Sequence, residues 1–284
     1  MTLNKLHKKG FSIAVKTGGA NNDHLKFARE ASKGEMFYNT FDDKLYIATS
    51  DAGAADAILY NTDAFSLTPP PYGNAYSITM DGANDHLSLA NSVTTSGEFT
   101  ISMWVKPLSG NEGMMFKGTG TEYINWYGPL YGNKLLVRNM GGITTGTDTM
   151  LANNWYHVLY SRNSSNLATL YLNGSSVGSA TFTNNFTFNK IWESNANGLH
   201  GRVDEVAFWT DDQSANIADI RDTTLGTPKN LGDMTTQPTH WWRMGDYPGD
   251  YNSGSGTSIT DQGIGTSNTA SFQNGPNFSL DIPS

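Results

Sequence analysis

Residues 99–107 read FTISMWVKP, and this stretch says more about the fold than any other part of the chain. Apolar side chains alternate along it with Thr, Ser and Trp, as expected when successive side chains of a strand point to opposite faces. One face is formed by Phe99, Ile101, Met103 and Val105. Because Trp104 lies on the other face, we expect both faces to be covered, and we expect Pro107 to end the strand.

Further strand patterns follow at intervals typical of a β-sandwich. They cover residues 76–80, 155–160, 168–172 and 201–209. The third of them runs into Asn173-Gly174, a strong hairpin signal. Gly174–Gly178 also fits the Gly-x-Ser-x-Gly pattern of serine hydrolases, but a strand pattern follows it where a nucleophile elbow needs a helix. One helix is expected, over residues 213–222.

The composition favours strands and excludes several classes of partner. Charged residues make up 15% of the 284 residues, with 30 Gly and no Cys, a balance typical of strands joined by tight polar turns. The net charge of −8 argues against a nucleic-acid partner, which needs Lys and Arg to neutralise phosphates. No apolar stretch near the N-terminus is long enough for a membrane span. Without Cys, no disulfide or thiolate metal site supports the fold.

A domain boundary is expected at Pro69-Pro70-Pro71, which forms a stiff extended joint. We expect a small β-rich docking and oligomerisation module over residues 1–70 and a large all-β domain over residues 71–284. Residues 1–10 carry three Lys and are interpreted as a flexible or docking tail. Because so small a module has little core of its own, we expect it to bury surface against neighbouring copies or a host structure.

Within the module, the alternating residues 35–38 and 44–48 flank turn residues and predict a hairpin, and residues 25–29 also alternate. This region resembles the N-terminal β module of phage tail-fibre and tropism proteins. The matching elements are Lys26-Phe27, Gly34-Glu35, Tyr38-Asn39-Thr40 and Lys44-Leu45-Tyr46-Ile47. The alternative is a generic hairpin with ordinary turn residues.

The larger region resembles the laminin-G-like jelly roll of the concanavalin A-like lectin/glucanase superfamily. Five motifs occur in the expected order: Met80-Asp81-Gly82 with Asp85, Phe99–Val105, Trp155-Tyr156-His157, Leu170–Gly174 and Gly201–Val206. The resemblance implies an all-β fold, a jelly-roll β-sandwich of two antiparallel sheets. It also implies a lectin-like binding function.

The same superfamily includes glucanases, whose two catalytic carboxyls usually lie on one strand as Glu-x-Asp-x-(x)-Glu. This chain has no such strand, and its six His show no zinc-binding spacing. We therefore expect no enzymatic activity and assign no catalytic residue. The alternative is a catalytic site whose two carboxyl groups come from strands far apart in the sequence.

Members of the superfamily often hold a structural ion where this chain has Asp81, Asp85 and Asp204, so the resemblance implies a candidate calcium site. Hard cations favour carboxylates and carbonyls gathered at turns. The alternative is that Asp81 and Asp85 are turn residues and that Asp204 pairs locally, for instance with Arg202. Apart from calcium, no cofactor is expected.

Residues 123–133 are rich in aromatic and amide side chains. Aromatic faces stack on sugar rings, and Asn offers hydroxyl groups both a donor and an acceptor. The segment therefore suggests a glycan platform made of Tyr123, Asn125, Trp126, Tyr127 and Tyr131. The alternative is that these aromatic side chains fill the core.

Together the two resemblances imply a structural protein on the virion surface of a bacteriophage. The N-terminal module docks on other virion proteins, and the jelly roll, as a capsid decoration or a fibre-type protein, faces host-surface glycans. We expect a homo-oligomer, specifically a trimer. The first alternative is a tail-fibre receptor-binding protein that recognises host cell-surface polysaccharide. The second is a secreted glycan-binding protein or glycoside hydrolase.

Overall fold

A computed structural model of the protein describes strands in the N-terminal region and most of the remaining chain. The described residues are 2–8, 11–18, 36–39, 44–47, 73–110, 112–118, 123–138, 143–144, 149–193 and 199–283. The chain divides into two compact units, Met1–Tyr72 and Gly73–Ser284.

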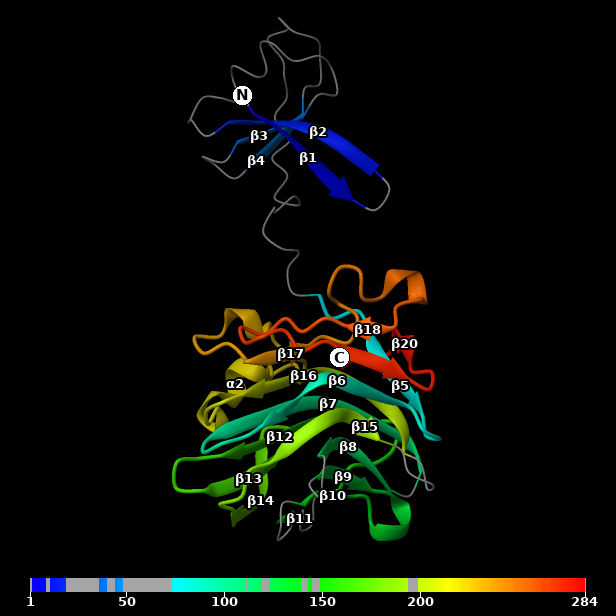
Figure 1. Ribbon diagram of the computed structural model, residues 1–284, viewed down its shortest axis with the longest axis vertical. Helices are drawn as coiled ribbons and strands as arrows, with labels where there is room; N and C mark the ends of the chain where they lie inside the picture. The colour runs from blue at the N-terminus through cyan, green and yellow to red at the C-terminus, as the bar shows by residue number, and fades with distance from the viewer. Residues whose placement is uncertain are drawn as a thin grey trace, which may run out of the picture. The chain divides into compact units, whose positions relative to one another are not determined.

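The first unit contains a four-stranded sheet in the order β1-β2-β3-β4 (Figure 1). Its strands are β1 (Thr2–Lys8), β2 (Phe11–Gly18), β3 (Met36–Asn39) and β4 (Lys44–Ile47). The expected hairpin forms, because β3 and β4 pair antiparallel. Strand β2 pairs with β3 in parallel. The expectation of a tail over residues 1–10 needs correction. Residues 2–8 form strand β1, which gains backbone hydrogen-bond partners by pairing with β2. The alternating residues 25–29 and the proline joint lie outside the described residues.

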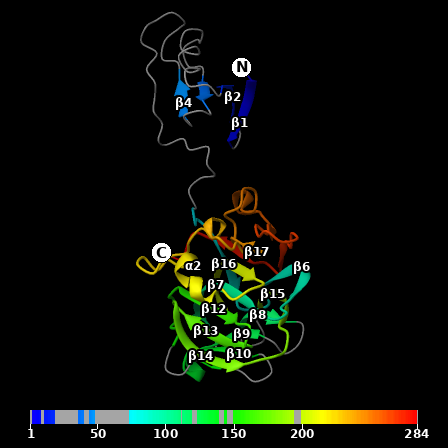
Figure 2. The same cartoon turned by 90° about the vertical axis from the view of Figure 1, so that its left-hand side faces the viewer.

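The second unit is a sandwich of two eight-stranded sheets (Figures 1 and 2). The first sheet has the order β11-β10-β9-β8-β15-β6-β19-β18. Its strands are β6 (His86–Thr94), β8 (Glu112–Gly118), β9 (Tyr123–Tyr127), β10 (Lys134–Arg138), β11 (Ile143–Thr144), β15 (Thr187–Glu193), β18 (Ser258–Ile259) and β19 (Ala270–Gln273).

The second sheet has the order β14-β13-β12-β7-β16-β5-β20, with β17 pairing to β16. Its strands are β5 (Ser77–Asp81), β7 (Phe99–Ser109), β12 (Tyr156–Arg162), β13 (Leu167–Leu172), β14 (Ser175–Thr181), β16 (His200–Trp209), β17 (His240–Trp242) and β20 (Asn277–Ser279). All described pairings in both sheets are antiparallel, as the jelly-roll prediction requires.

Strand β7 runs through the middle of the second sheet, between β12 and β16. Its apolar side chains join the core, and Trp104 on the outer face is only 3% exposed. The Thr100 hydroxyl donates to the carbonyl of Asp211 at 2.9 Å, so the segment after β16 covers this outer face. The prediction that both faces are covered is therefore confirmed. The predicted end at Pro107 is wrong, because the register with β16 shifts there and an irregular ladder tolerates proline.

The hairpin signal is also confirmed. Asn173 and Gly174 connect β13 to β14 with φ angles of 52° and 87°, the left-handed conformation that tight hairpins need. Residues 174–178 consequently lie in a hairpin and its strand, not in a nucleophile elbow. The expected helix is shorter than predicted and consists of η2 (Ser214–Asn216) and α2 (Ile217–Ile220). Three more single turns are η1 (Pro129–Tyr131), η3 (Leu231–Asp233) and η4 (Asn252–Gly254).

Side chains from both sheets meet in one core, which includes the fully buried Trp126, Trp192 and Trp242. On the outer face of the second sheet, Asp281 near the chain end accepts hydrogen bonds from Lys106 at 2.7 Å and Arg202 at 2.6 Å. Lys106 and Arg202 are direct cross-strand partners on β7 and β16. One carboxylate thus neutralises a like-charge pair that would otherwise repel. Among the described residues, no helix is long and apolar enough to cross a membrane.

Candidate functional site

A β-bulge in β16 places two adjacent carboxyl groups on one side of the sheet. From Asp204 to Ala207 this strand advances three residues while β7 advances two, and Glu205 within the bulge has a φ of 46°. Val203 and Val206 on either side of the acidic pair both lie in the core. The extra residue therefore lets both carboxyl groups leave on the face away from the core.

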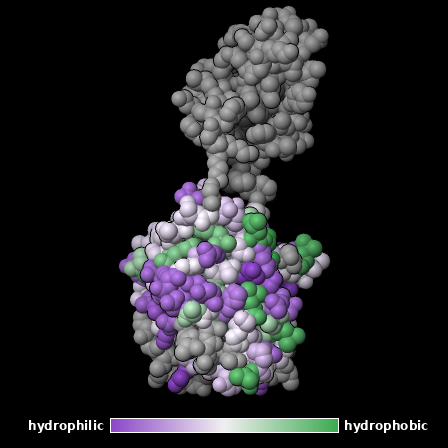
Figure 3. All heavy atoms as spheres, turned by 90° about the vertical axis from the view of Figure 1, so that its right-hand side faces the viewer, coloured by the Kyte–Doolittle hydropathy of each residue, from purple (hydrophilic) through white to green (hydrophobic). Residues whose placement is uncertain are grey.

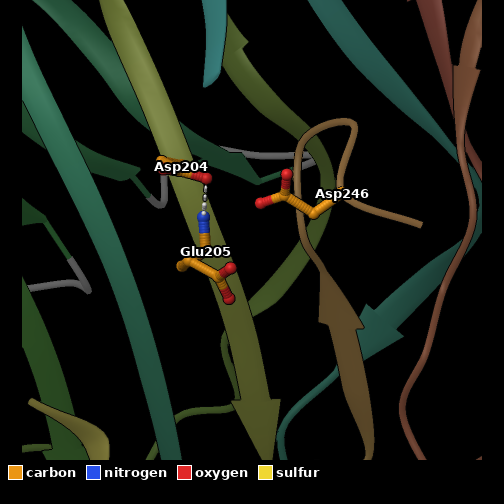
Figure 4. Close-up of side chains that lie close together, drawn as sticks. All are labelled: Asp204, Glu205 and Asp246. Atoms are coloured by element: carbon orange, nitrogen blue, oxygen red, sulfur yellow. Dashed lines mark hydrogen bonds between the residues drawn. The ribbon is translucent and has the colours of Figure 1, made fainter. Parts of the chain in front are cut away.

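These two groups meet Asp246, which follows β17 in the chain. Oxygen atoms of Asp204, Glu205 and Asp246 lie within 4.8 Å of one another, and Figure 4 shows the side chains converging. We call these three residues the acidic cluster. Asp204 and Glu205 are 0% and 2% exposed. Within the described residues, this is the group of acidic or His side chains with metal-binding spacing.

Groups from several segments contact the acidic cluster. The Arg243 guanidinium donates to Glu205 Oε1 at 3.3 Å and lies 3.8 Å from Asp246 Oδ2. The Trp241 indole donates to the other Glu205 oxygen at 2.6 Å. Asp204 accepts hydrogen bonds from the Asn74 side-chain amide at 2.9 Å and from the Glu205 backbone N–H at 2.8 Å. Arg243 thus contacts two of the three carboxyl groups.

The pKa values reflect the burial of these groups. Burial, together with the charge of Glu205, raises the pKa of Asp204 well above its ordinary value. Burial also raises the pKa of Asp246 to about 7, against the hydrogen bond that its carboxylate accepts from the Ala75 backbone N–H. Near neutral pH Asp246 is therefore partly protonated.

The donor set fits a hard cation. Asn74 Oδ1 and Asp246 Oδ2 are buried and have no hydrogen-bond partner. Carboxylate and amide oxygens are the ligands that Ca²⁺ prefers, and the resemblance of the fold implies this ion. The residues that could hold it are Asn74, Asp204, Glu205 and Asp246.

The same carboxyls do not offer a glycosidase site. Retaining glycosidases need a carboxyl pair about 5 Å apart with a sugar bound between them. The space beside Glu205, which Ser102 and Trp104 also line, is too small for a sugar ring.

A second chemically suggestive pair is Ser102 with His157. The Ser hydroxyl lies 2.8 Å from Nε2 of the imidazole, and both residues are buried. Burial lowers the pKa of His157 to about 3, and its Nδ1 has no hydrogen-bond partner. Without an acid to orient the imidazole and without substrate access, this pair lacks the elements of a catalytic triad. It is a buried structural contact.

The structure does not gather the three residues predicted to bind calcium. Asp81 is exposed and accepts a hydrogen bond from the Ala83 backbone, while Asp85 accepts one from the Asp81 backbone at 2.9 Å. Asp81 is the last residue of β5, and Asp85 lies in the turn that follows. Asp81 is paired with His200, four residues before Asp204 on β16, which places Asp204 roughly 13 Å away along the strand. Asp204 instead joins the acidic cluster, and Arg202 binds Asp281.

The predicted glycan platform is divided between the two faces of β9. Trp126 points into the core, is 0% exposed and donates its indole N–H to the Met150 carbonyl, so its ring faces no solvent. Asn125 is 4% exposed and accepts a hydrogen bond from the Gly113 backbone. The predicted platform is therefore corrected: Trp126 and Asn125 are buried and do not belong to it. Tyr123 and Tyr127 are half-buried on the outer face, and Tyr131 is 56% exposed with its ring 5.4 Å from that of Tyr127.

Sequence reasoning missed three members of the candidate cation site: Asn74, Glu205 and Asp246. Two adjacent acids inside the apolar run of residues 203–209 were an available signal, because buried Asp and Glu are rare. No sequence pattern could have indicated Asp246, since it lies some forty residues further on.

Comparison with known proteins agrees with this architecture. Residues 81–216 match the Laminin_G_3 family model, described as the concanavalin A-like lectin/glucanases superfamily. This part of the sandwich therefore resembles a laminin-G-like domain of this superfamily. No curated protein sequence matches the chain significantly.

Solved structures resemble the chain at low identity. A protein of Bacteroides ovatus provisionally designated as carbohydrate-binding superposes with a TM-score of 0.55 and 14% identity, covering 89% of this chain and 71% of its own. A heptameric pentraxin of Limulus polyphemus has a TM-score of 0.42 and 14% identity, covering 58% and 86%. The binding domain of botulinum neurotoxin DC, solved in complex with SialylT, has a TM-score of 0.33 and 13% identity, and the match covers 50% of this chain and 44% of that domain's chain. At these identities the likeness concerns the fold.

The raised pKa of Asp246 gives a testable pH dependence. The unfolded carboxyl ionises near 3.8 and the folded one near 7, so folding favours the protonated form. With chelator present, the unfolding free energy should fall as pH rises from 4 to 7, by up to about 4 kcal/mol from this group. Asp246→Asn should remove that loss in urea unfolding curves. The exposed Asp233→Asn should keep it, and equal pH slopes for wild type and Asp246→Asn would contradict the assignment.

Proposed function

We propose that this protein binds glycans with its lectin-like sandwich and does so from the surface of a bacteriophage virion. The observation that carries the binding part is the concanavalin A-like fold with an aligned set of outer tyrosines. Binding without catalysis is supported by the buried positions of the acidic cluster and of His157. The provisional carbohydrate-binding designation of the Bacteroides ovatus protein is consistent with this proposal.

The tyrosines Tyr123, Tyr127 and Tyr131 supply the sugar contact. Tyr131 and its neighbour Leu130, which is 73% exposed, extend the aromatic line from β9 onto η1. Figure 3 shows that both hydrophilic and hydrophobic side chains reach the surface on one side of the sandwich; it does not single out the tyrosines. Apolar rings beside polar groups are what a sugar ring needs for stacking and hydrogen bonding.

Replacing the most exposed ring tests the glycan contact. Tyr131→Ala should weaken binding to those polysaccharides that wild type retains on a glycan array by about three- to tenfold, the value of one aromatic contact. Its melting temperature should stay within a degree or two of wild type. Tyr247, which is 42% exposed elsewhere on the sandwich, provides a matched Tyr247→Ala control. An array that stays blank for wild type would overturn the glycan function.

We also propose that calcium occupies the acidic cluster as a structural ion. The carboxylates of Asp204, Glu205 and Asp246 and the amide oxygen of Asn74 would hold it. The ion would supply the positive charge that Arg243 alone does not provide. Because Asn74 lies just before β5 and Asp246 lies after β17, such an ion would join distant parts of the sandwich.

Calcium binding should appear as added stability, since an ion that binds only the folded state raises the unfolding free energy by about 2.7 kcal/mol at a hundred times its Kd. At neutral pH, excess calcium should raise the melting temperature of wild type by several degrees. It should have much less effect on Asp246→Asn and an unchanged effect on Asp81→Asn. A wild-type melting temperature that ignores calcium would refute the site.

The virion placement rests on the first unit. Its resemblance to phage tail-fibre and tropism modules suggests that it docks on other virion proteins and displays the sandwich outward. A trimer would let three small sheets share buried surface that one module lacks. Capsid decoration and a tail-fibre receptor-binding role both follow from this arrangement.

The docking role can be tested with whole particles. Light scattering of purified full-length protein should give the mass of a trimer, and the protein should rebind particles from which it has been stripped. A particle reconstruction then locates the copies on the capsid or on the tail. Monomeric protein that does not associate with particles would contradict the virion role.

A further inference from the structure

A cavity of about 460 Å³ lies in the segment that joins β16 to β17. Its lining comes from α2, from η3 and from the residues beside η3. The lining residues are Asp219, Lys229, Asn230, Asp233, Met234 and Thr235, and we call the space they enclose the α2–η3 cavity. Ligand pockets in proteins measure roughly 300–1,000 Å³, so this cavity is large enough for a single sugar ring.

The α2–η3 cavity belongs to a part of the chain that the family model does not match, since the matched residues end at 216. Helix α2 lies over the outer face of the second sheet (Figure 2). Ile220 and Leu231 are buried there and line, together with Trp104 of β7, the narrow space beneath this segment. Because Tyr123 and Tyr127 belong to the first sheet, the cavity is a separate site on the other side of the sandwich.

Hydrogen bonds hold the walls of the cavity in place. The Lys229 backbone N–H donates at 3.1 Å to the carbonyl of the last α2 residue, which joins α2 to the segment before η3. Asn230 caps η3, because its Oδ1 accepts a hydrogen bond from the Gly232 N–H at 3.2 Å. Beyond η3, the Trp209 indole donates to the Thr236 carbonyl at 3.1 Å. The lining is therefore preorganised, which reduces the ordering cost of binding a ligand.

The lining offers hydroxyl groups both acceptors and donors. Asp219 and Asp233 are exposed and present carboxylate oxygens, which accept hydrogen bonds. Lys229 supplies an ammonium group that donates, and Thr235 supplies a hydroxyl that can do either. Met234 is 8% exposed and adds apolar surface to the wall. This combination of polar groups and an apolar patch fits a sugar ring, which has hydroxyl groups at its edge and C–H groups on its face.

Charges of both signs line the cavity, so it favours a neutral ligand. The carboxylates of Asp219 and Asp233 accompany the ammonium group of Lys229. Lys229 also acts on Asp222, whose pKa is lowered chiefly by two backbone hydrogen bonds and further by this positive charge. An ionic ligand of either sign would meet a group of its own sign in the lining. The hydroxyl groups of a neutral sugar can both donate and accept, so they can pair with every polar group there.

We infer that the α2–η3 cavity binds one neutral pyranose ring of a glycan. Ring hydroxyl groups donate to the carboxylates of Asp219 and Asp233 and accept from Lys229, and the C–H face of the ring packs on Met234. Hydrogen bonds to charged groups are stronger than neutral ones, so the two carboxylates dominate the affinity. This inference rests on the proposed glycan binding and adds a second sugar site to it.

The test uses the methyl glycosides of glucose, galactose and mannose, because each presents a single neutral ring. Full-length protein should bind at least one of them with a Kd on the order of 1 mM in a calorimetric or NMR titration. Asp219→Asn and Asp233→Asn should each weaken that binding about three- to tenfold, through the loss of a charge-assisted hydrogen bond. Asp81→Asn, which changes an exposed Asp on β5, is the matched control and should bind as wild type.

A side chain that fills the cavity provides a second test that does not depend on charge. Thr235 and Thr236 are neighbours and both are exposed, and Thr235, unlike Thr236, lines the cavity. Thr235→Phe should therefore abolish binding of the methyl glycoside, whereas Thr236→Phe should leave it unchanged. The melting temperatures of both variants should stay close to that of wild type, because neither side chain is buried.

The remaining outcomes separate this inference from the proposed function. Methyl glycosides that bind wild type, Asp219→Asn and Thr235→Phe equally, or that do not bind at all, would overturn the cavity site. Polysaccharide binding that depends on Tyr131 would then still support the glycan function. Glucosamine that binds more than about tenfold more tightly than glucose would overturn the neutral assignment in favour of a cationic ligand. If the glycan array is also blank for wild type, the proposed function itself fails.

Discussion

The burial of two adjacent carboxyl groups in the middle of β16 is the constraint around which the sandwich is arranged. Isolated buried carboxylates are costly, so partners must come to them. Asn74 arrives from the segment before β5, and Trp241 and Arg243 arrive from β17 and the residue after it. Segments far apart in the chain are thus held at one place, and burial there raises the pKa of Asp246 to about 7.

Both outer faces of the sandwich place like charges on neighbouring strands. On the second sheet, Asp281 near the end of the chain compensates Lys106 and Arg202. On the first sheet, Lys117 and Lys190 are cross-strand partners, and Lys190 forms an ion pair with Glu193 three residues further along its strand. In each case the sheet register brings like charges together, and a nearby acid offsets their repulsion.

Local patterns in the sequence predicted the fold well because local rules govern the features concerned. The alternation of residues 99–105 placed Phe99 and its partners in the core, and Asn173-Gly174 gave the hairpin. Predictions failed where a distant segment decided the outcome. Trp126 looks like a sugar platform in sequence, yet the facing sheet buries it. Pro107 should end a strand, but a shift in the ladder accommodates it.

The sequence by itself therefore determined the fold class, the inner and outer faces of the main strands and the turn chemistry, since these depend on period-two alternation and on residues a few positions apart. Only the tertiary structure decided which polar residues act together. The β16 bulge turns Glu205 to the same side as Asp204, and a loop some forty residues later brings Asp246 to them. Strand order likewise makes Lys117 and Lys190 neighbours. Register and strand order arise from the packing of the whole sandwich, and no stretch of sequence contains them.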